Sequence, residues 1–218
     1  MDRLASTDRS RFLSLAIRRN LRSHTFLFFQ GDASHNVIVL ETGYVKIAST
    51  IDDREITLDV LGPGEIIGEL GAVDGSTRSA TASTLTDVRA LFVSASSFSG
   101  LVGTSPGVAA SLAHDMARRL RDASQRQVEY GALDGLGRVC GRLVELMRRY
   151  GRDSGGDVVI EAPLNQSDIA SWAGLSREAV VKALRSLRDV GWVTTTGRLI
   201  TVVDPGAVTR RAGGSVDR

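Results

Sequence analysis

The sequence of 218 residues predicts an α+β protein with an N-terminal β-roll, a long helix and a C-terminal winged helix-turn-helix domain. Three observations carry this prediction. Short β-rich runs fill residues 25–93, a long proline-free segment follows Pro106, and two short amphipathic helices joined by a glycine lie near the C-terminus. We expect the roll at 1–108, the long helix and a hinge at 109–135, and the winged helix-turn-helix domain at 136–218.

The N-terminal part predicts one helix followed by strands. A short amphipathic helix is expected over residues 8–21, where Phe12, Leu15 and Ile17 lie among arginines. Strands separated by turn residues follow, and strands at this spacing favour a small barrel or roll. The predicted strands are 25–29, 37–40, 44–49, 56–61, 80–84 and 88–93. Residues 68–81 interrupt them, and we expect one turn of helix and a loop there.

A long helix is predicted to begin at Ser105-Pro106, because serine caps helices and proline is tolerated at the first helical position. Apolar or small residues then recur every three or four positions, which is typical of a helix that pairs with a second copy. The predicted seam consists of Leu112, Met116, Leu120, Ala123, Gln127 and Tyr130. A single helix lying on its own domain is the alternative, but the helix length and flanking charges favour a parallel homodimer.

The C-terminal part predicts a hinge and then a winged helix-turn-helix. Glycines at 131–137 suggest the hinge, with Asp134 capping a helix that reaches Tyr150. After a Gly155-Gly156 turn and a strand at 158–161, the pattern is helix, turn at Gly174, helix capped by Ser176, and hairpin. The second helix turns Ala179, Val180, Ala183, Leu184 and Leu187 inward. The hairpin comprises 192–196, the turn Gly197-Arg198, and 199–203.

Charge is divided unequally along the chain. Residues 1–135 contain 14 Lys and Arg against 16 Asp and Glu, whereas residues 136–218 contain 13 against 9. A basic C-terminal domain is compatible with a polyanion such as nucleic acid, although solvated protein faces are often basic as well.

Composition argues against metal and redox chemistry. The single cysteine, Cys140, lies among apolar residues at helical spacing and is expected to be a packed hydrophobe. The three histidines show no ligand spacing. We therefore expect no metal, no haem and no iron–sulfur cluster. With neither a signal peptide nor a membrane-spanning run, we expect a cytoplasmic protein without a membrane partner.

The segment 68–81 has the residue types of a site for a small anion. Arg78 can form a bidentate pair with phosphate, and the backbone N–H groups of a one-turn helix at Gly68 can bind the same group. Glu69 repels phosphate but can accept hydrogen bonds from a sugar hydroxyl and help to orient Arg78. The segment therefore fits a ribose phosphate. A surface loop with a Glu–Arg salt bridge is an equally supported alternative.

The outward residues of the second helix of the helix-turn-helix can read bases. Arg177 and Lys182 carry donors for guanine O6 and N7, while Glu178 accepts from cytosine N4. A solvated face of an ordinary three-helix core is the alternative, and the helix-turn-helix pattern with its wing favours base reading.

At these two segments the chain resembles the catabolite activator protein family, the cyclic-AMP receptor and anaerobic-regulator transcription factors. Gly68-Glu69-Leu70 followed by Arg78-Ser79-Ala80 is similar to the phosphate-binding cassette of that family. Residues 176–180, Ser-Arg-Glu-Ala-Val, are similar to the start of its recognition helix. Residues 116–120 and 133–138 resemble its dimer helix and hinge, and the likeness extends from about Phe12 to Val203.

The resemblance implies a homodimeric transcription regulator, not an enzyme, with a cyclic nucleotide effector, cyclic AMP before others. It implies a double-stranded DNA operator with GTGA-like palindromic half-sites, and RNA polymerase as a partner. Glu69 would hold the ribose 2′-hydroxyl, and Arg78 with Ser79 would bind the cyclic phosphate. The implied ligand residues are Gly68, Glu69, Leu70, Arg78, Ser79, Ala80, Ile47, Leu58, Arg119, Ala123 and Ser124. The implied DNA residues are Gln166, Ser176, Arg177, Glu178, Lys182 and Arg185.

Two positions depart from the family pattern. Ala123-Ser124 stands where cyclic-AMP receptors have a Thr-Ser pair that binds adenine, so one base-edge hydrogen bond is missing and cyclic GMP or another nucleotide stays open. Lys182 replaces an arginine and weakens bidentate readout.

Three alternatives are left open. They are a DNA-binding regulator of this family with a vestigial cassette, a signalling module without DNA, and a nucleotide-processing enzyme. The enzyme is disfavoured because the sequence shows no nucleophile–base pair, metal cluster or Walker-type loop.

Overall fold

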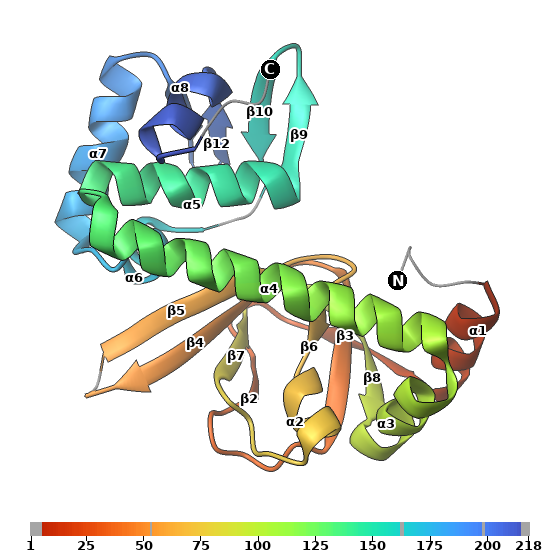
Figure 1. Cartoon of the computed structure of the whole chain (residues 1–218). Coiled ribbons are helices and arrows are strands. Elements are labelled where there is room, and N and C mark those ends of the chain that lie inside the picture. Colours follow the sequence, from red (N-terminus) through yellow and green to blue (C-terminus); the bar gives the residue numbers. More distant parts are fainter. Residues whose placement is uncertain (1–5, 53, 162–163, 198, 215–218) are drawn as a thin grey trace. The chain divides into compact units, whose positions relative to one another are not determined.

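The computed structural model describes residues 6–52, 54–161, 164–197 and 199–214. The chain divides into two compact units, with the division between Leu120 and Arg121. Helix α4 (Pro106–Ala132) passes through this division and is the long green helix of Figure 1. Its first turns therefore belong to the first unit and its last turns to the second.

Two four-stranded antiparallel sheets build the β-roll of the first unit. The first sheet has the order β1-β8-β3-β6, with strands Ile17–Leu21, Val88–Ser94, Asn36–Thr42 and Ile66–Ile67. The second has the order β2-β7-β4-β5, with strands Phe26–Phe28, Thr81–Thr84, Val45–Ile51 and Arg54–Leu61. The expectation of a small roll is confirmed.

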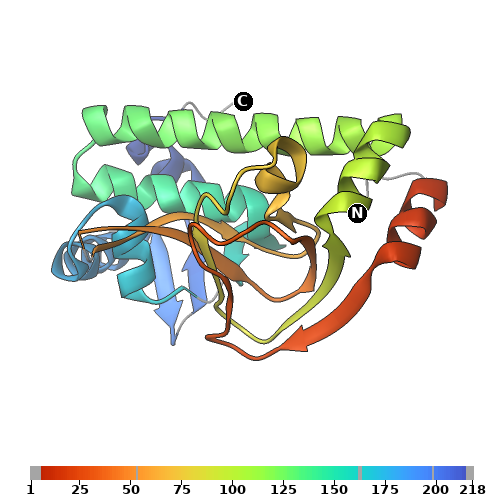
Figure 2. The ribbon, with the colours of Figure 1, turned by 90° about the horizontal axis from the view of Figure 1, so that it is seen from below.

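Alternation along the strands gives the first unit two apolar layers, because successive side chains of a strand point to opposite faces. Ile38 and Leu40 of β3 pack inside the roll, whereas Val37 and Val39 pack on its outer face. Helices α1 (Ser6–Leu15), α3 (Ala95–Thr104) and the start of α4 cover that outer face, at one end of the unit in Figures 1 and 2. Their buried contacts are Phe12, Phe98, Leu101, Val108 and Leu112.

In the described residues of the second unit, the last turns of α4 are followed by helices α5 to α8 and a small sheet. Helix α5 (Gly135–Tyr150) returns alongside the end of α4 (Figures 1 and 2). The helix-turn-helix is α6 (Gln166–Ala173) and α7 (Arg177–Asp189), and α8 (Pro205–Arg211) closes the chain. The antiparallel sheet has the order β11-β12-β10-β9, with strands Val193–Thr196, Leu199–Val202, Asp157–Ile160 and Gly151–Ser154.

The predicted helix starts are confirmed by their caps. Ser105 Oγ accepts a hydrogen bond from Val108 N at 3.2 Å, and α4 begins at Pro106. Asp134 accepts from Gly137 N at 2.9 Å, and Ser176 accepts from Ala179 N at 3.2 Å. Gly174 takes the left-handed conformation (φ 62°) that the tight turn requires. These local signals are reliable because each one satisfies backbone groups that a helix end leaves unpaired.

Several elements differ from the prediction. The helix expected over 8–21 ends at Leu15, and residues 17–21 form β1, which pairs with β8. Ile17 is 63% exposed, so its apolar side chain does not mark a helical core face. Strands β6 and β9 and helices α3 and α8 were not expected. Helix α3 is rich in serine and glycine, residues with low helix propensity, and it forms because Phe98 and Leu101 are buried. Arg198 of the predicted wing turn lies outside the described residues.

The predicted seam of α4 divides into buried and exposed parts. Leu112 is 8% exposed and lies in the core of the first unit, and Met116 packs against that core. Leu120 is 69% exposed, and Val128, which the prediction did not include, is 62% exposed. The exposed small and apolar residues of α4 form a neighbouring stripe of Ala113, Ala117, Leu120, Ser124 and Val128. Their spacing of three and four residues keeps them on one face of the helix.

Candidate functional site

Gly68 occupies a position that only glycine fits. It lies between β6 and α2 (Glu69–Asp74) and has φ 76°, in the left-handed region. A Cβ built at Gly68 would lie 2.0 Å from one terminal nitrogen of Arg78. The backbone of Gly68 and the guanidinium of Arg78 are therefore in direct contact, ten residues apart in sequence.

The guanidinium of Arg78 is buried and held by backbone carbonyls. The residue is 5% exposed, and Nη1 donates to Gly68 O at 2.8 Å. Nη2 donates to Asn36 O at 2.7 Å and to Asn36 Oδ1 at 3.0 Å. The guanidinium carbon lies 4.0 Å from the centre of the Phe28 ring. These contacts hold a cation next to the first turn of α2 with little conformational freedom.

Arg78 also has a buried donor atom without a partner. Its Nε–H is buried without a hydrogen-bond partner among the described residues. Burial lowers the pKa of Arg78, and the carboxylates of Glu69 and Asp32 partly offset that effect. An arginine stays protonated at neutral pH even when its pKa is lowered. The site therefore presents a fixed positive charge and the unused Nε–H donor, which suits an anion.

Glu69 pairs with an arginine of the long helix rather than with Arg78. The side chain of Glu69 is 5% exposed, and its Oε1 accepts from Arg119 Nη1 at 2.8 Å. Arg119 also donates to Ile66 O, and the neighbouring Arg118 pairs with Glu65 at 2.5 Å. The alternative of an exposed loop with a Glu69–Arg78 salt bridge does not fit, because both residues are buried and Glu69 pairs elsewhere.

The other predicted ligand residues are distributed as follows. Ile47 is half-buried on β4, Ser79 is exposed, and Ala80 is buried directly before β7. Leu58 and Leu70 are 40% and 44% exposed. Ala123 and Ser124 are exposed on α4 in the second unit, and their part in ligand binding stays a prediction. The structure thus brings together Gly68, Glu69, Arg78 and Arg119.

Sequence reasoning missed two residues that build this site. Asn36 accepts hydrogen bonds from Arg78 through both its main-chain carbonyl and its side-chain oxygen, and Phe28 stacks on the same guanidinium. Asn36 is 42 residues from Arg78 in sequence. No local pattern could reveal this contact, because β-sheet packing brings the two segments together.

The second candidate surface lies on the helix-turn-helix. As predicted, Arg177, Glu178, Lys182 and Arg185 are exposed on α7, whereas Val180, Ala183, Leu184 and Leu187 are buried. Hydrogen bonds from its own backbone N–H and from the Ser176 hydroxyl lower the pKa of Glu178. Glu178 is therefore an ionised acceptor at neutral pH, and its neighbours are donors.

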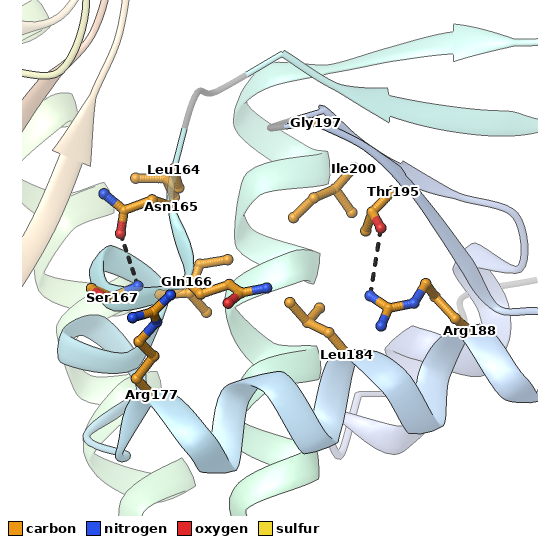
Figure 3. A pocket seen from close by; sticks show the side chains of 11 residues that line it. Leu164, Asn165, Gln166, Ser167, Arg177, Leu184, Arg188, Thr195, Gly197 and Ile200 are labelled. Atoms are coloured by element: carbon orange, nitrogen blue, oxygen red, sulfur yellow. Dashed lines mark hydrogen bonds between the residues drawn. The ribbon is translucent and has the colours of Figure 1, made fainter.

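A groove of about 380 Å³ adjoins this surface (Figure 3). It lies between the start of α6, helix α7 and the β11–β12 wing, and the described residues that line it include Arg177 and Arg188 but no acidic residue. Arg188 donates to Thr195 Oγ1 of the wing at 3.5 Å. The lining residues are Leu164, Asn165, Gln166, Ser167, Ile169, Arg177, Leu184, Arg188, Thr195, Gly197 and Ile200. Gln166 and Arg177 were predicted DNA residues; Arg188 and Thr195 were not.

Arg188 has a sequence signal that was overlooked. It follows Arg177 by 11 residues, and 11 residues span about three helical turns, so both side chains leave the same face of α7. Both line the groove. An apolar floor with cationic walls fits the sugar–phosphate backbone of a nucleic acid.

Other features of the described chain are limited. None of its helices combines the length and apolar character that crossing a bilayer demands. Among the described residues, no three His, Cys, Asp or Glu side chains gather as a metal site would require. Cys140 is buried, and burial raises the pKa of its thiol to about 11, so it is not a reactive thiolate.

Two domain families match the chain. Residues 18–105 match the cyclic nucleotide-binding domain, and residues 137–211 match the Crp-like helix-turn-helix domain. A CRP-like cAMP-activated global transcriptional regulator from Mycobacterium tuberculosis is 32% identical over 88% of this chain and 85% of its own length. The cAMP-activated global transcriptional regulator CRP of Salmonella typhimurium is 28% identical over 88% of this chain and 91% of its own.

A solved structure shares the fold. FixK2 from Bradyrhizobium japonicum superposes with a TM-score of 0.81 at 23% identity, covering 93% of this chain and 99% of its own. The chain belongs to the CRP family of transcription regulators. It is a DNA-binding regulator with a cyclic nucleotide-binding domain, and the family is not one of enzymes.

Proposed function

We propose that this regulator is a homodimer whose effector is a cyclic nucleotide, with cyclic AMP as the first candidate, and that it reads a palindromic operator with GTGA-like half-sites. The observation that carries the ligand half is the contact of buried Arg78 with Gly68, beside the buried pair of Glu69 and Arg119. The relative from Mycobacterium tuberculosis, a cAMP-activated regulator, supports cyclic AMP.

The residues of the site fit the parts of a cyclic nucleotide. The fixed charge and unused Nε–H of Arg78 would attract the cyclic phosphate, with the exposed hydroxyl of Ser79 as a second donor. Glu69 keeps Oε2 for a ribose hydroxyl while Oε1 accepts from Arg119. A ligand bound by Glu69 would therefore act directly on an arginine of α4.

Regulation would follow from differential binding. A ligand shifts a conformational equilibrium only by as much as it prefers one state over the other. Because Arg118 and Arg119 both hold the segment around β6 to α4, contacts at Glu69 are well placed to favour one state of that helix.

The DNA half of the proposal rests on α7 and its groove. Arg177, Glu178 and Lys182 would contact base edges, and the groove with Arg188 would bind the DNA backbone beside them.

The exposed stripe on α4 with Leu120 and Val128 supports a dimer. Two α7 helices in successive major grooves require half-sites about 34 Å apart. RNA polymerase stays a predicted partner.

Titration calorimetry of the full chain with cyclic AMP and cyclic GMP tests the ligand half. We expect heat with at least one nucleotide, and the stronger binder identifies the base that Ala123-Ser124 leaves undecided. Absence of heat with both nucleotides would contradict the ligand assignment. For DNA, fluorescence anisotropy measures the affinity for two duplexes. The affinity for a GTGA palindrome should exceed the affinity for a scrambled duplex by at least about 10³-fold.

An effector-independent regulator is the second candidate. It is favoured by the three hydrogen bonds that Arg78 already makes to Gly68 and Asn36, which engage part of its donors without any ligand. In that case operator affinity would be the same with and without either cyclic nucleotide.

A further inference from the structure

The second sheet of the roll carries a row of four side chains that cross its four strands. Phe28 of β2 lies opposite Ala82 of β7, and Ile47 of β4 lies opposite both Ala82 and Asp59 of β5. Directly opposed residues of antiparallel strands point to the same face of the sheet. Ala82 belongs to the core inside the roll, and Phe28 and Ile47 pack against that core. The row therefore lies on the inner face of the sheet, and we call it the inner row.

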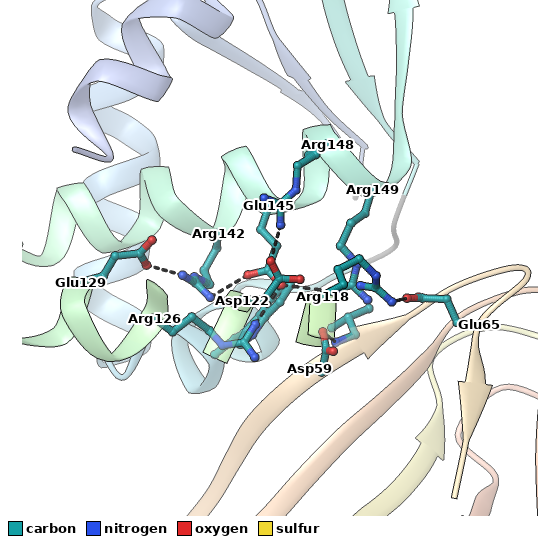
Figure 4. Close-up of polar contacts among 12 residues, drawn as sticks. Asp59, Glu65, Arg118, Asp122, Arg126, Glu129, Arg142, Glu145, Arg148 and Arg149 are labelled. Atoms are coloured by element: carbon teal, nitrogen blue, oxygen red, sulfur yellow. Dashed lines mark hydrogen bonds and ion pairs between the residues drawn. The ribbon is translucent and has the colours of Figure 1, made fainter. Parts of the chain in front are cut away.

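A β-bulge precedes Asp59 and sets its direction. The pairing of β4 with β5 shifts at Leu58, which has no residue opposite it. After the bulge the pairing is regular, and Leu61, two residues beyond Asp59, lies in the same inner core. Side chains two positions apart in a strand share a face, so Asp59 points inward. Figure 4 shows Asp59 on β5, together with the pair of Glu65 and Arg118.

Asp59 is the charged member of an otherwise apolar row. It is 8% exposed, and its Oδ1 accepts from Val60 N at 2.8 Å. Burying a carboxylate among apolar side chains costs free energy unless donors satisfy it, so packing alone does not account for an aspartate at this position. A carboxylate offers about four acceptor positions on its two oxygens, so it can accept donors in addition to Val60 N.

The other end of the inner row holds the candidate phosphate donor. The guanidinium carbon of Arg78 lies 4.0 Å from the centre of the Phe28 ring. Neighbouring strands lie about 4.8 Å apart, so three spacings place the main chains of Phe28 and Asp59 about 14 Å apart. A hydrogen bond at each end takes up about 3 Å, and the remaining length suits a purine nucleotide between its phosphate and the far edge of its base.

A carboxylate at the base end distinguishes the two purines. Guanine presents its N1–H and its 2-amino group side by side, and these two donors match the two oxygens of a carboxylate. Adenine presents a 6-amino donor beside N1, which is an acceptor and is repelled by a carboxylate. A site that is built to receive hydrogen bonds rejects a ligand that lacks the donors, because the buried acceptor is then left unpaired.

We propose that Asp59 is the specificity-determining residue for the base of the effector and that it selects guanine. The inference rests on the proposed function, and it places cyclic GMP before cyclic AMP among the effectors considered there. Asp59 would read the base from the roll itself, whatever part Ala123 and Ser124 have in binding.

Titration calorimetry of the full chain tests the proposal with cyclic GMP and cyclic AMP on wild type and on Asp59→Asn. An asparagine amide keeps one acceptor and replaces the other with a donor, a pattern that matches adenine and conflicts with guanine N1–H. Wild type should bind cyclic GMP at least about tenfold more tightly than cyclic AMP. Asp59→Asn should reverse that order, so that the ratio of the two affinities changes about 100-fold or more.

The matched control is Asp87→Asn, which removes the same charge from the same unit. Asp87 is exposed and accepts from Ser23 N at 2.9 Å. Its substitution should leave the ratio of the two affinities at the wild-type value. The ratio isolates base reading, because a lost charge or a structural defect changes the affinity for both nucleotides alike.

Two results would overturn the proposal. One is tighter binding of cyclic AMP than of cyclic GMP by wild type, and the other is the same affinity ratio in Asp59→Asn and Asp87→Asn. If wild type binds neither nucleotide, the ligand half of the proposed function fails and this inference fails with it. Binding without discrimination by Asp59 is a different result and contradicts this inference alone.

Wild type by itself decides the question if Asp59→Asn does not fold. Cyclic IMP carries hypoxanthine, which keeps the N1–H of guanine and lacks its 2-amino group. Its affinity should lie about tenfold below that of cyclic GMP, because one donor to the carboxylate is missing. Equal affinities of wild type for cyclic GMP and cyclic IMP would contradict the proposal.

Discussion

The two candidate sites use arginine in opposite ways. Arg78 and Arg119 near Glu69 are wholly or largely removed from water and bound to carbonyls or a carboxylate of their own unit. Arg177 and Arg185 on α7 are exposed, as is Lys182. A buried guanidinium is pre-positioned and selects one small ligand by geometry, whereas an exposed one is solvated and suits a long polyanion with many weak contacts.

The difference predicts how each region responds to substitution. Removing a buried arginine leaves its partners unsatisfied, so folding and ligand binding change together. Removing an exposed arginine changes only binding to the partner. The predictions that follow test this contrast, beginning with the largest expected effect.

Arg78→Leu should abolish detectable cyclic nucleotide binding and lower the free energy of unfolding by roughly 3 kcal/mol, because Gly68 O and the Asn36 oxygens lose their donor. Calorimetry and urea unfolding measure the two effects. The control is Arg89→Leu, which removes an exposed ion pair with Glu41 at 3.1 Å. It should lower the free energy of unfolding by less than about 1 kcal/mol. Full nucleotide binding by Arg78→Leu would remove this residue from the ligand site.

Gly68→Ala should lower the free energy of unfolding by about 2 kcal/mol and weaken nucleotide binding, because the new methyl group meets the Arg78 guanidinium. Gly75→Ala is the matched control. Gly75 has the same φ of 76°, but a Cβ there meets no atom within 4 Å. The control should therefore show only the backbone cost, about 1 kcal/mol, with unchanged nucleotide affinity. Equal ligand affinities in the two variants would argue against contact through Arg78.

Arg177→Ala and Arg188→Ala should separate base reading from backbone contact on the same face of α7. Arg177→Ala should lose about 1–3 kcal/mol on the operator and relax discrimination at one base pair. Arg188→Ala should weaken operator and random duplex equally and reduce the slope of log K against log salt by about 1. Anisotropy at several salt concentrations measures the affinity and the salt slope of both variants. If Arg188→Ala lost discrimination and Arg177→Ala weakened both duplexes equally, the two roles would be reversed.

The smallest effect concerns pH. Hydrogen bonds from Gly137 N and Arg211 lower the pKa of Asp134, so its folded-state pKa lies below that of the unfolded chain. The stability that it contributes is fully present above the unfolded value of about 4 and is lost as the pH falls through the folded value. Asp134→Asn should therefore reduce the slope of the free energy of unfolding against pH below about pH 4. The slope at pH 7–8 should stay unchanged. Thermal unfolding across pH tests this, and an unchanged acid limb would contradict it.

Much of the candidate chemistry was predictable because it is written in contiguous segments. Gly68-Glu69 and Arg78 stand in one short segment, and Ser176 with Arg177 and Glu178 opens one helix. The helix caps at Ser105, Asp134 and Ser176 are likewise local, since a cap involves residues three positions apart or fewer. Strand β1 was mistaken for helix because Ile17 and its neighbours have no strand alternation, and their conformation is imposed by pairing with β8.

The sequence alone determined the order of roll, long helix and winged helix-turn-helix, the helix caps, the exposed face of α7 and the residue types of both sites. These features depend on periodicity and on side chains near each other in the chain. The tertiary structure decided which partner each buried charge takes. Glu69 pairs with Arg119 and not with Arg78, Arg78 rests on Gly68 and Asn36, and Arg142 joins α4 to α5. Such choices depend on distances between segments far apart in sequence and on the cost of leaving a charge unpaired away from water, and neither can be read from local pattern.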